Sequence, residues 1–295
     1  MLNASAPRIS VVIVNYNGRH YLQRCLASLA AQTYPAFEVI VVDNASVDGS
    51  TEWLAVHFPS TRVICSPRNL GFAAGNNLGI RAARGEFIAT LNNDTELEPD
   101  YLARLLAPMA DPAIGACAAL MLEFNRRDRI DSAGIRLDRA GFAWNRYAGR
   151  PVDGLGTERQ VWGACAGAAL YRMQLLDEIG LFDEDYFAFY EDVDLAWRAQ
   201  RAGWACALAA DARVYHIHGG SFRHGSAQKL YLLARNRWWT LLKNEPLPAL
   251  ALNLPLIAGL DLLALLRAVL VQRSLAPLCG RVDAWRGLRR MWRKR

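Results

Sequence analysis

The sequence RISVVIVNYN at residues 8–17 is a near-continuous run of β-branched residues. Such a run is expected of a parallel strand that is buried on both faces. Residues 19–32 follow it with apolar side chains at helical spacing: Tyr21, Leu22, Cys25, Leu26 and Leu29. The chain therefore opens with a strand and an amphipathic helix.

The same order recurs through the first half of the chain. Strand patterns are FEVIVVDNAS (37–46), TRVICSP (61–67) and GEFIATLN (85–92), and helix patterns are GSTEWLAVHF (49–58) and FAAGNNLGIRAA (72–83). This alternation predicts an α/β fold with a Rossmann-like, mainly parallel central sheet and helices on both faces.

The pattern loosens after about residue 120. Residues 136–157 are rich in Gly, Arg and aromatics, which favours loops or irregular strands that shape a site. Residues 172–180 and 191–203 are helical in pattern, and residues 205–219 predict a strand followed by a His-containing loop.

Composition limits the class of protein. The chain has 295 residues, 53% hydrophobic and 21% charged, which is a globular balance. Its six cysteines lie singly, so neither a zinc ribbon nor a redox dithiol is indicated. No secretory leader is visible in residues 1–10, so we expect reduced thiols in a cytoplasmic protein.

The net charge of +6 is concentrated in the C-terminal segment. Residues 246–295 contain eight Arg and one Lys, and their only acidic residues are Asp261 and Asp283. This segment therefore has a net charge of +7, and residues 1–245 have a net charge of about −1. A nucleic-acid-binding face on the body is therefore not expected.

Polar residues gather where the predicted strands end. They are Asn15, Tyr16 and Asn17, then Asp43, Asn44 and Ser46, then Asn69, and finally Asn92, Asn93 and Asp94. Each group alone fits a turn or a helix cap. Ligands of open α/β sheets bind beyond the carboxyl ends of the strands, so four such groups together predict a nucleotide site.

Five motifs resemble a known family. SVVIVNYNG, VVDNASVDGS, NLGFAAGNNLGI, LNNDT and FDEDYFAFYEDVDLAWRAQRAG, in this order, resemble bacterial family 2 glycosyltransferases of the GT-A fold, rhamnosyltransferase-like branch, over residues 8–240. The resemblance implies a nucleotide-sugar donor, a divalent cation (Mg²⁺ or Mn²⁺) and inversion at the anomeric carbon. Gly71 and Gly75 form no GxGxxG motif, so a dinucleotide-binding dehydrogenase fits poorly.

The resemblance assigns the donor side of the site. The family's DxD-type motif matches Asn92, Asn93 and Asp94, where Asn replaces the first Asp and leaves Asp94 as the anionic metal ligand. One carboxylate and diphosphate oxygens suffice for a weak site that fills when donor is present. By the same resemblance, Asp43 is expected to contact the nucleobase of the donor, which favours UDP- or dTDP-sugars. Further donor-binding candidates are Asn15, Asn17, Asn44, Arg68, Asn69, Gly71 and Asn76.

The resemblance also assigns the catalytic and acceptor side. Asp192 takes the general-base role and Glu191 lies beside it, although acidic residues also favour a helix's first turn. Asp194 is expected to face away. Trp162 and Gly163 are acceptor-side candidates, with a core role as the alternative for Trp162.

A late histidine completes the expected metal site. His216 is the preferred ligand and His218 the second choice, with a structural histidine as the alternative. Gly219, Gly220 and Ser221 suggest a loop that closes over the diphosphate. Arg235 or Arg237 is a candidate phosphate contact, or else a solvated helix residue.

The C-terminal segment is predicted to be helical, apolar and then basic. We place a glycosyltransferase domain at residues 1–240, with halves of about 1–120 and 121–240, and a tail at 241–295. The tail's composition favours attachment to an anionic membrane over packing on the body or spanning the bilayer. This places the protein peripherally on the cytoplasmic face of the inner membrane.

The sequence thus predicts an inverting, metal-dependent transferase acting on a glycan or lipid-linked saccharide in cell-surface polysaccharide synthesis. Rhamnose from dTDP-rhamnose is the favoured donor by resemblance. The alternatives are a UDP-hexose or UDP-N-acetylhexosamine transferase, or a catalytically weak, membrane-associated sugar-nucleotide binder.

Overall fold

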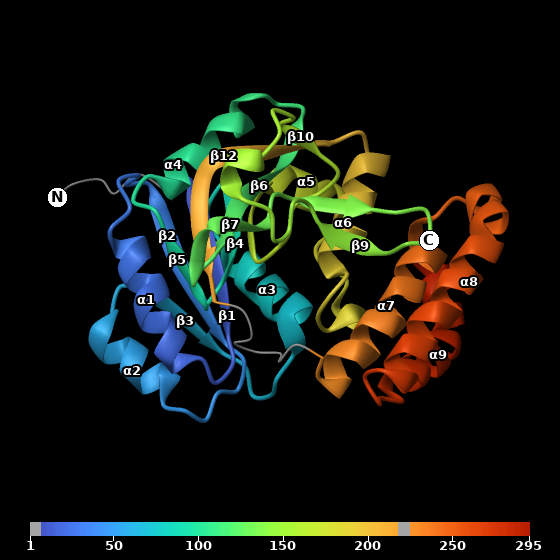
Figure 1. Cartoon of the computed structure of the whole chain (residues 1–295). Coiled ribbons are helices and arrows are strands. Elements are labelled where there is room, and N and C mark those ends of the chain that lie inside the picture. The colour runs from blue at the N-terminus through green and yellow to red at the C-terminus, as the bar shows by residue number, and fades with distance from the viewer. Residues whose placement is uncertain (1–6, 218–224) are drawn as a thin grey trace.

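The computed structural model describes residues 7–217 and 225–295. Its centre is one sheet in the order β10-β12-β6-β11-β4-β1-β2-β3 (Figure 1). The predicted strands are β1 (Ile9–Asn15), β2 (Phe37–Asp43), β3 (Arg62–Cys65) and β4 (Phe87–Asn92), which pair in parallel. The intervening helices are α1 (Arg19–Ala30), α2 (Ser50–His57) and α3 (Gly71–Ala82). The predicted α/β architecture is confirmed.

The chain after β4 adds strands that the sequence pattern did not reveal. They are β5 (Thr95–Leu97), β6 (Ile114–Glu123), β7 (Arg126–Ser132), β10 (Gln160–Val161) and β11 (Ala168–Arg172), and a separate hairpin of β8 (Ile135–Leu137) and β9 (Ala143–Asn145). The long β12 (Ala205–His216) lies where a strand was predicted and runs parallel to β6. β11 lies antiparallel between β4 and β6, so the added half joins the first sheet directly.

The remaining helices complete the chain. They are α4 (Tyr101–Leu106), α5 (Met173–Ile179), α6 (Glu191–Arg201), α7 (Ala227–Asn244), α8 (Leu247–Leu270), α9 (Ala276–Arg286) and α10 (Leu288–Arg293), with 3₁₀ turns at Ala107–Ala110, Val152–Gly154 and Glu184–Tyr186. α5 and α6 match the predicted helices. The boundary predicted between residues 240 and 241 falls inside α7.

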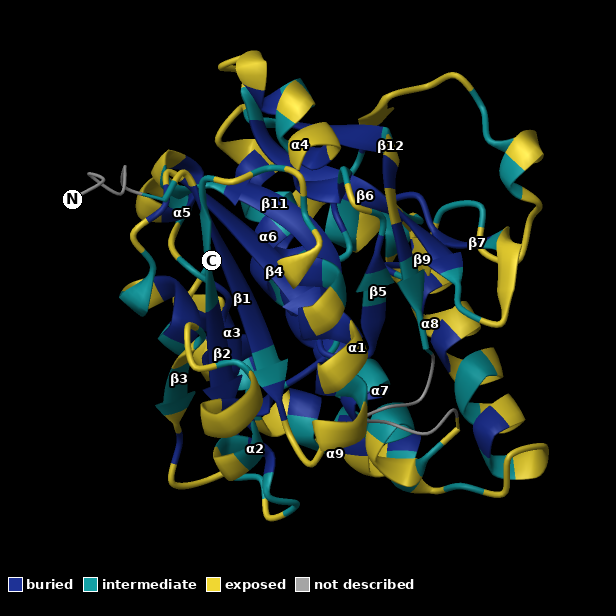
Figure 2. Cartoon of the chain, turned by 90° about the vertical axis from the view of Figure 1, so that its left-hand side faces the viewer, coloured by how far each residue is buried: buried dark blue, intermediate teal, exposed yellow. Residues whose placement is uncertain are grey.

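Both faces of the sheet are covered, because alternate residues of β1 point to opposite sides. Val11 and Ile13 belong to the apolar core under α1 and α4, whereas Val12 belongs to the core under α3, α5 and α6. α3 packs so closely that a Cβ at Gly79 would lie 2.4 Å from Cγ1 of Val12. The strands are therefore largely buried, and their carboxyl ends emerge together (Figure 2).

The C-terminal helices differ in how well they are covered. α7 and α9 pack side by side, and Trp239, Ala284 and Met291 form a buried cluster with Tyr186 and Tyr190 of the body. α8 lies outside them with most of its leucines exposed. By length and composition α8 is able to cross a membrane.

Candidate active site

The strand register brings the predicted polar residues together. Asn15 is paired with Asp43 across β1 and β2, and Val14 is paired with Asn92 across β1 and β4. Asn93 and Asp94 form the turn between β4 and β5, where the Thr95 hydroxyl donates to the Asn92 carbonyl at 2.7 Å. Residues 92–95 are thus a turn and also part of the group of polar residues at the strand ends.

A cleft of about 930 Å³ opens beyond these strand ends. It brings together Asn44, Asn69, Gly71, Asn92, Asn93, Asp94, Glu191, Asp192 and His216 from the predicted residues. Residues far apart in the sequence therefore line one space. A cavity of this volume accommodates a nucleotide and a sugar.

Asp94, His216 and Asp131 form a chain of polar contacts at the cleft. His216 Nε2 lies 3.2 Å from Asp94 Oδ1, and its Nδ1 lies 2.8 Å from Asp131 Oδ2. Burial alone would lower the pKa of His216, but the hydrogen bonds to both carboxylates outweigh it and raise the pKa to about 10. Each ring nitrogen of His216 thus faces one carboxylate.

These atoms fit a weak divalent cation site. Asp94 Oδ1 and His216 Nε2 are close enough to share one cation, and a carboxylate on the far ring nitrogen is typical of metal-ligating histidines. Within residues 7–217 and 225–295, no three His, Cys, Asp or Glu side chains converge in a ready-made metal cage. The other ligands would have to be diphosphate oxygens and water. His218 and Gly219–Ser221 lie outside the described residues.

Glu191 and Asp192 begin helix α6 and line the same cleft. Asp192 accepts hydrogen bonds from the backbone N–H groups of Ala166 (3.2 Å) and Val193 (2.8 Å). Burial raises the pKa of Asp192 despite these hydrogen bonds, and burial together with the charge of Asp192 raises the pKa of Glu191 strongly. A carboxylate with a raised pKa at the mouth of a cleft suits a general base.

The loop that leads into α6 is strained. Phe187, Phe189 and Tyr190 have positive φ angles of 65°, 67° and 69°. The buried Asn236 side chain on α7 donates to the carbonyls of Ala188 (2.9 Å) and Phe189 (2.7 Å). Such strain persists only where the surroundings hold it, so α7 fixes the loop that leads into α6.

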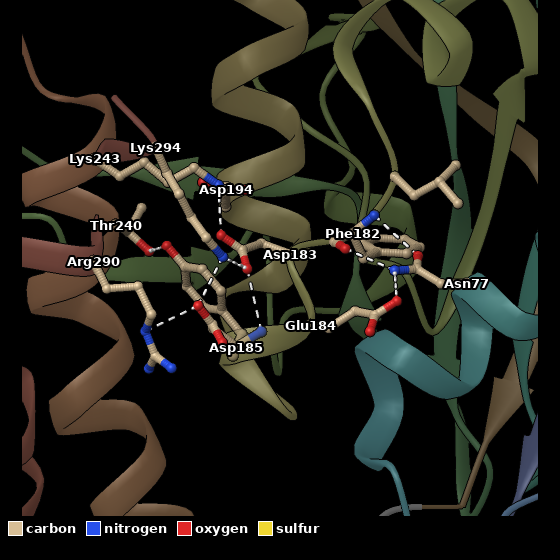
Figure 3. A network of polar contacts seen from close by, with 12 residues as sticks. Asn77, Phe182, Asp183, Glu184, Asp185, Asp194, Thr240, Lys243, Arg290 and Lys294 are labelled. Carbon is tan, nitrogen blue, oxygen red and sulfur yellow. Dashed lines mark hydrogen bonds and ion pairs between the residues drawn. The ribbon is translucent and has the colours of Figure 1, made fainter. Parts of the chain in front are cut away.

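The first turn of α6 is held in place by a network of ion pairs around Asp183 and Asp194 (Figure 3). Lys243 Nζ lies 2.9 Å from both Asp183 Oδ2 and Asp194 Oδ2, and Lys294 Nζ lies 2.5 Å from Asp183 Oδ1. Asp194 also pairs with Arg198 at 2.9 Å. Asp194 is therefore structural and faces away from the cleft, as predicted.

Amide side chains join the ends of β2 and β3 at one end of the cleft. Asn44 Nδ2 donates to Asn69 Oδ1 (2.9 Å) and to the Gly71 carbonyl (3.1 Å), which joins the second and third strand ends. Asp43 accepts from the Ser46 N–H at 3.0 Å, is buried, and is not among the residues that line the cleft. Gly71 has a φ of +80°, and a Cβ there would lie 2.5 Å from the Phe187 carbonyl.

Several predicted residues do not line the cleft. Asn15 is buried and donates to Asp43, Ser46 and Ser50, and Asn76 donates within α3 to Phe72. Arg68 is exposed, and Asn17 accepts from the Val47 N–H. Their expected contacts with the donor remain predictions.

The predicted acceptor and phosphate residues also lie elsewhere. Trp162 and Gly163 pack behind α6, where Trp162 meets Trp197 edge to face. Arg235 donates to the carbonyls of Asp185 (3.1 Å) and Tyr186 (2.9 Å), so its guanidinium supports the strained loop. Arg237 is buried against Asp261 and is not a solvated helix residue.

Other residues line the cleft without a signal in the sequence. They are Glu123, Arg126, Asp131, Trp144, Cys165, Gly167 and Lys229, among others. Lys229 lies at the first turn of α7, and no described carboxylate lies within ion-pair distance of it. Asp131 ends a strand, β7, that the sequence pattern did not predict, so its position was not foreseeable.

The fold and the cleft define a GT-A type of glycosyltransferase. Residues 10–180 match the Glycosyl transferase family 2 model, and the chain belongs to this family. The family inferred from the motifs is thereby confirmed.

The curated relatives agree with this family. An uncharacterised protein of Sinorhizobium fredii is 29% identical over 74% of this chain, which spans about a quarter (25%) of that protein. The N-acetylglucosaminyl-diphospho-decaprenol L-rhamnosyltransferase of Mycobacterium tuberculosis is 27% identical over 78% of this chain and 86% of its own length.

Solved structures share the fold. GalNAc-T7 with UDP, GalNAc and Mn²⁺ superposes with a TM-score of 0.63 at 18% identity, covering 83% of this chain and 52% of that one. The mannosyltransferase PcManGT of Pyrobaculum calidifontis with GDP-Man and Mn²⁺ gives 0.61 at 19% identity, covering 98% and 84%. The GT-A fold is thus confirmed.

Proposed function

We propose that this chain transfers a sugar from a nucleotide diphosphate donor to a saccharide hydroxyl with inversion. The observation that carries the proposal is the meeting of Asp94 and His216 with Glu191 and Asp192 across one cleft. One wall holds groups for a diphosphate and its cation, and the other holds a candidate base. Both are needed for a single in-line displacement.

The donor occupies the wall formed by the strand ends. Asn44, Asn69 and Gly71 line this part of the cleft and are the candidate contacts for the nucleoside. Asp43, at the end of β2 beside Asn44, favours the imide of uracil or thymine. A divalent cation held by Asp94 and His216 would neutralise the charge of the departing nucleoside diphosphate. Lys229 is the better candidate than Arg235 for a phosphate contact, because it lines the cleft.

Asp192 acts on the acceptor. Its carboxylate takes the proton of the acceptor hydroxyl as that oxygen bonds to the anomeric carbon and the bond to the diphosphate breaks. Asp131 holds His216 through Nδ1 and so keeps Nε2 turned toward Asp94. The strained loop before α6 fixes the position of Asp192.

The biological role follows from family and relatives. We propose a glycan or lipid-linked saccharide acceptor in cell-surface polysaccharide synthesis, with dTDP-rhamnose as donor, because a 27% identical relative is named a rhamnosyltransferase. UDP-hexose and UDP-N-acetylhexosamine are the alternative donors. We place the protein peripherally on the cytoplasmic face of the inner membrane, since α8 is exposed and apolar.

A thermal-shift panel of dTDP- and UDP-sugars, with and without Mn²⁺, tests the donor. A true donor raises the melting temperature, and more so with Mn²⁺. Mn²⁺-dependent donor hydrolysis then separates a transferase from a sugar-nucleotide binder without catalysis. Stabilisation by no nucleotide sugar would overturn the proposal.

Asp192→Asn tests the base. We expect kcat to fall by roughly 10²–10⁴-fold while donor-induced stabilisation is unchanged. Asp177→Asn, an exposed carboxylate on α5, is the matched control and should retain wild-type turnover. Near wild-type turnover in Asp192→Asn would exclude Asp192 as the base.

A further inference from the structure

Helix α8 presents a largely apolar face to solvent, on which exposed Arg267 lies between Leu263 and Leu270. Leu252, Leu256, Leu260, Leu263 and Leu270 are between 37% and 82% exposed and recur at helical spacing. The buried residues Ile257, Asp261 and Ala268 lie on the opposite side of the helix. The exposed leucines therefore do not belong to the core of this chain.

Helix α9 repeats the arrangement. Leu275, just before it, and Leu278, Val282 and Trp285 within it are exposed at spacings of three and four residues. Pro277, Gly280 and Ala284 are its buried residues. A Cβ at Gly280 would lie 2.4 Å from the Tyr231 carbonyl, so this side packs tightly on α7. α8 and α9 lie next to each other (Figure 1). Both have exposed apolar residues on the side away from α7.

Cations accompany these apolar faces. Arg267, Arg273, Arg289 and Arg293 are exposed, as is Arg286, which pairs with Asp283 at 2.9 Å. Arg290 is turned toward the body, where it pairs with Asp185 at 3.1 Å. Soluble monomers rarely expose apolar patches of this extent. Helices that lie in the headgroup region of anionic bilayers typically combine leucine and tryptophan with arginine. Charge complementarity therefore favours an anionic lipid surface over a second copy of this basic segment.

Asp261 fixes α8 to the body near its midpoint. Its carboxylate is bound by Arg237 of α7 and by Arg281 of α9, whose Nε lies 2.7 Å from Asp261 Oδ2. Arg237 is 2% exposed. If α8 crossed a bilayer, Asp261 would enter the hydrocarbon and Arg237 would remain buried without its carboxylate. The ion pairs therefore oppose spanning although the helix is long enough.

We propose that α8 and α9 form an interfacial anchor that lies in the plane of an anionic bilayer and does not cross it. The inference deepens the proposed attachment to the inner membrane and rests on it. The apolar sides enter the headgroup boundary, the arginines contact lipid phosphates, and the Asp261 ion pairs stay intact beneath.

Flotation of the full chain with vesicles tests the surface. We expect binding to phosphatidylcholine vesicles that contain phosphatidylglycerol, release by high salt, and little binding to phosphatidylcholine alone. Leu270→Glu should reduce the bound fraction at least about tenfold, because it removes an apolar contact and adds a repelled charge. Val56→Glu on α2, matched at 74% exposure against 72% for Leu270, should bind like wild type.

Trypsin enclosed inside the vesicles tests the topology. An anchor that stays in the outer leaflet leaves the arginine-rich tail intact, whereas cleavage by the enclosed trypsin would overturn the proposal. Absence of flotation, with light scattering showing a dimer, would also overturn it in favour of a second copy. Donor binding is measured on the same preparations: flotation without any donor effect refutes the transfer reaction alone, and donor binding without flotation refutes the anchor alone.

Discussion

Replacing Lys243 with Met removes the central cation of the network in Figure 3. Lys243 is 5% exposed and contacts Asp183 and Asp194, both also buried. Met fills a similar volume but leaves each carboxylate with one cation fewer. Breaking a buried pair in this way typically costs 3–5 kcal/mol. Because Lys294 and Arg198 remain as partners, we expect the lower end, about 3 kcal/mol of unfolding free energy.

The pKa of Asp183 gives an independent magnitude. Burial would raise this pKa, but the charge of Lys243 and the hydrogen bonds from Lys294 and Lys243 outweigh it and lower the pKa to about 2. Against a usual value near 3.8, this is worth about 2.5 kcal/mol. Since the folded pKa is the lower one, this stability is present above about pH 4 and is lost as the pH falls toward 2. Without the charge of Lys243, the pKa of Asp183 is lowered less. The Lys243→Met variant therefore loses less stability on acidification than wild type.

Urea denaturation followed by circular dichroism measures both effects. The difference between wild type and Lys243→Met should be about 3 kcal/mol at neutral pH and should narrow as the pH falls from about 5 to about 3. Arg81→Met is the control, because Arg81 pairs with Glu184 on the surface and should cost at most about 1 kcal/mol. A loss below about 1 kcal/mol in Lys243→Met, or an acid slope equal to wild type, would refute the reasoning.

Three further predictions concern the cleft and the core. Asp131→Asn should weaken Mn²⁺ binding in the presence of UDP roughly 10–100-fold by electron paramagnetic resonance, whereas the neighbouring Asp128→Asn should not. Asn236→Asp keeps the size but removes the N–H donors to the strained loop, so kcat should fall at least about tenfold with an unchanged KM for donor and an unchanged circular dichroism spectrum. A loss of folded signal in proportion to the loss of kcat would indicate general unfolding instead. Gly79→Ala should cost about 1–3 kcal/mol by thermal denaturation, because its Cβ meets Val12. Gly259→Ala, with open space around it, should be neutral or slightly stabilising.

The first half of the fold was predictable because its signals are local. β1 and β2 are rich in β-branched residues and β4 is mainly apolar. Amphipathic helices separate these strands, and the topology alone brings the polar residues at their ends together. β6 gave no such signal: IGACAALMLE holds a single β-branched residue, and alanine and leucine favour helix in isolation. Its strand conformation comes from pairing with β12 and β11, which lie far along the chain.

The site was predictable where a motif fixes the residue and not where the role depends on a distant partner. Asp94 and Asp192 lie in motifs and line the cleft. Trp162 and Arg235 were chosen by residue type, yet both face other elements. Asp131 carried no motif, and only its contact with His216 reveals it. An arginine can donate hydrogen bonds to backbone carbonyls as well as to phosphate oxygens, and the sequence does not show which of these roles it has.

The contacts of helix α7 indicate that residues 246–295 cannot be removed without disturbing the rest of the fold. Its Asn236 supports the loop before Asp192, its Lys243 supports α6, and its Arg237 binds Asp261 of α8. Deletion of residues 246–295 would remove Asp261, leave Arg237 buried without a carboxylate and uncover Trp239. Such a truncation would lose catalysis and membrane binding together through misfolding. Substitutions on the exposed face of α8 change the lipid contact alone, so they are the perturbation that separates attachment from catalysis.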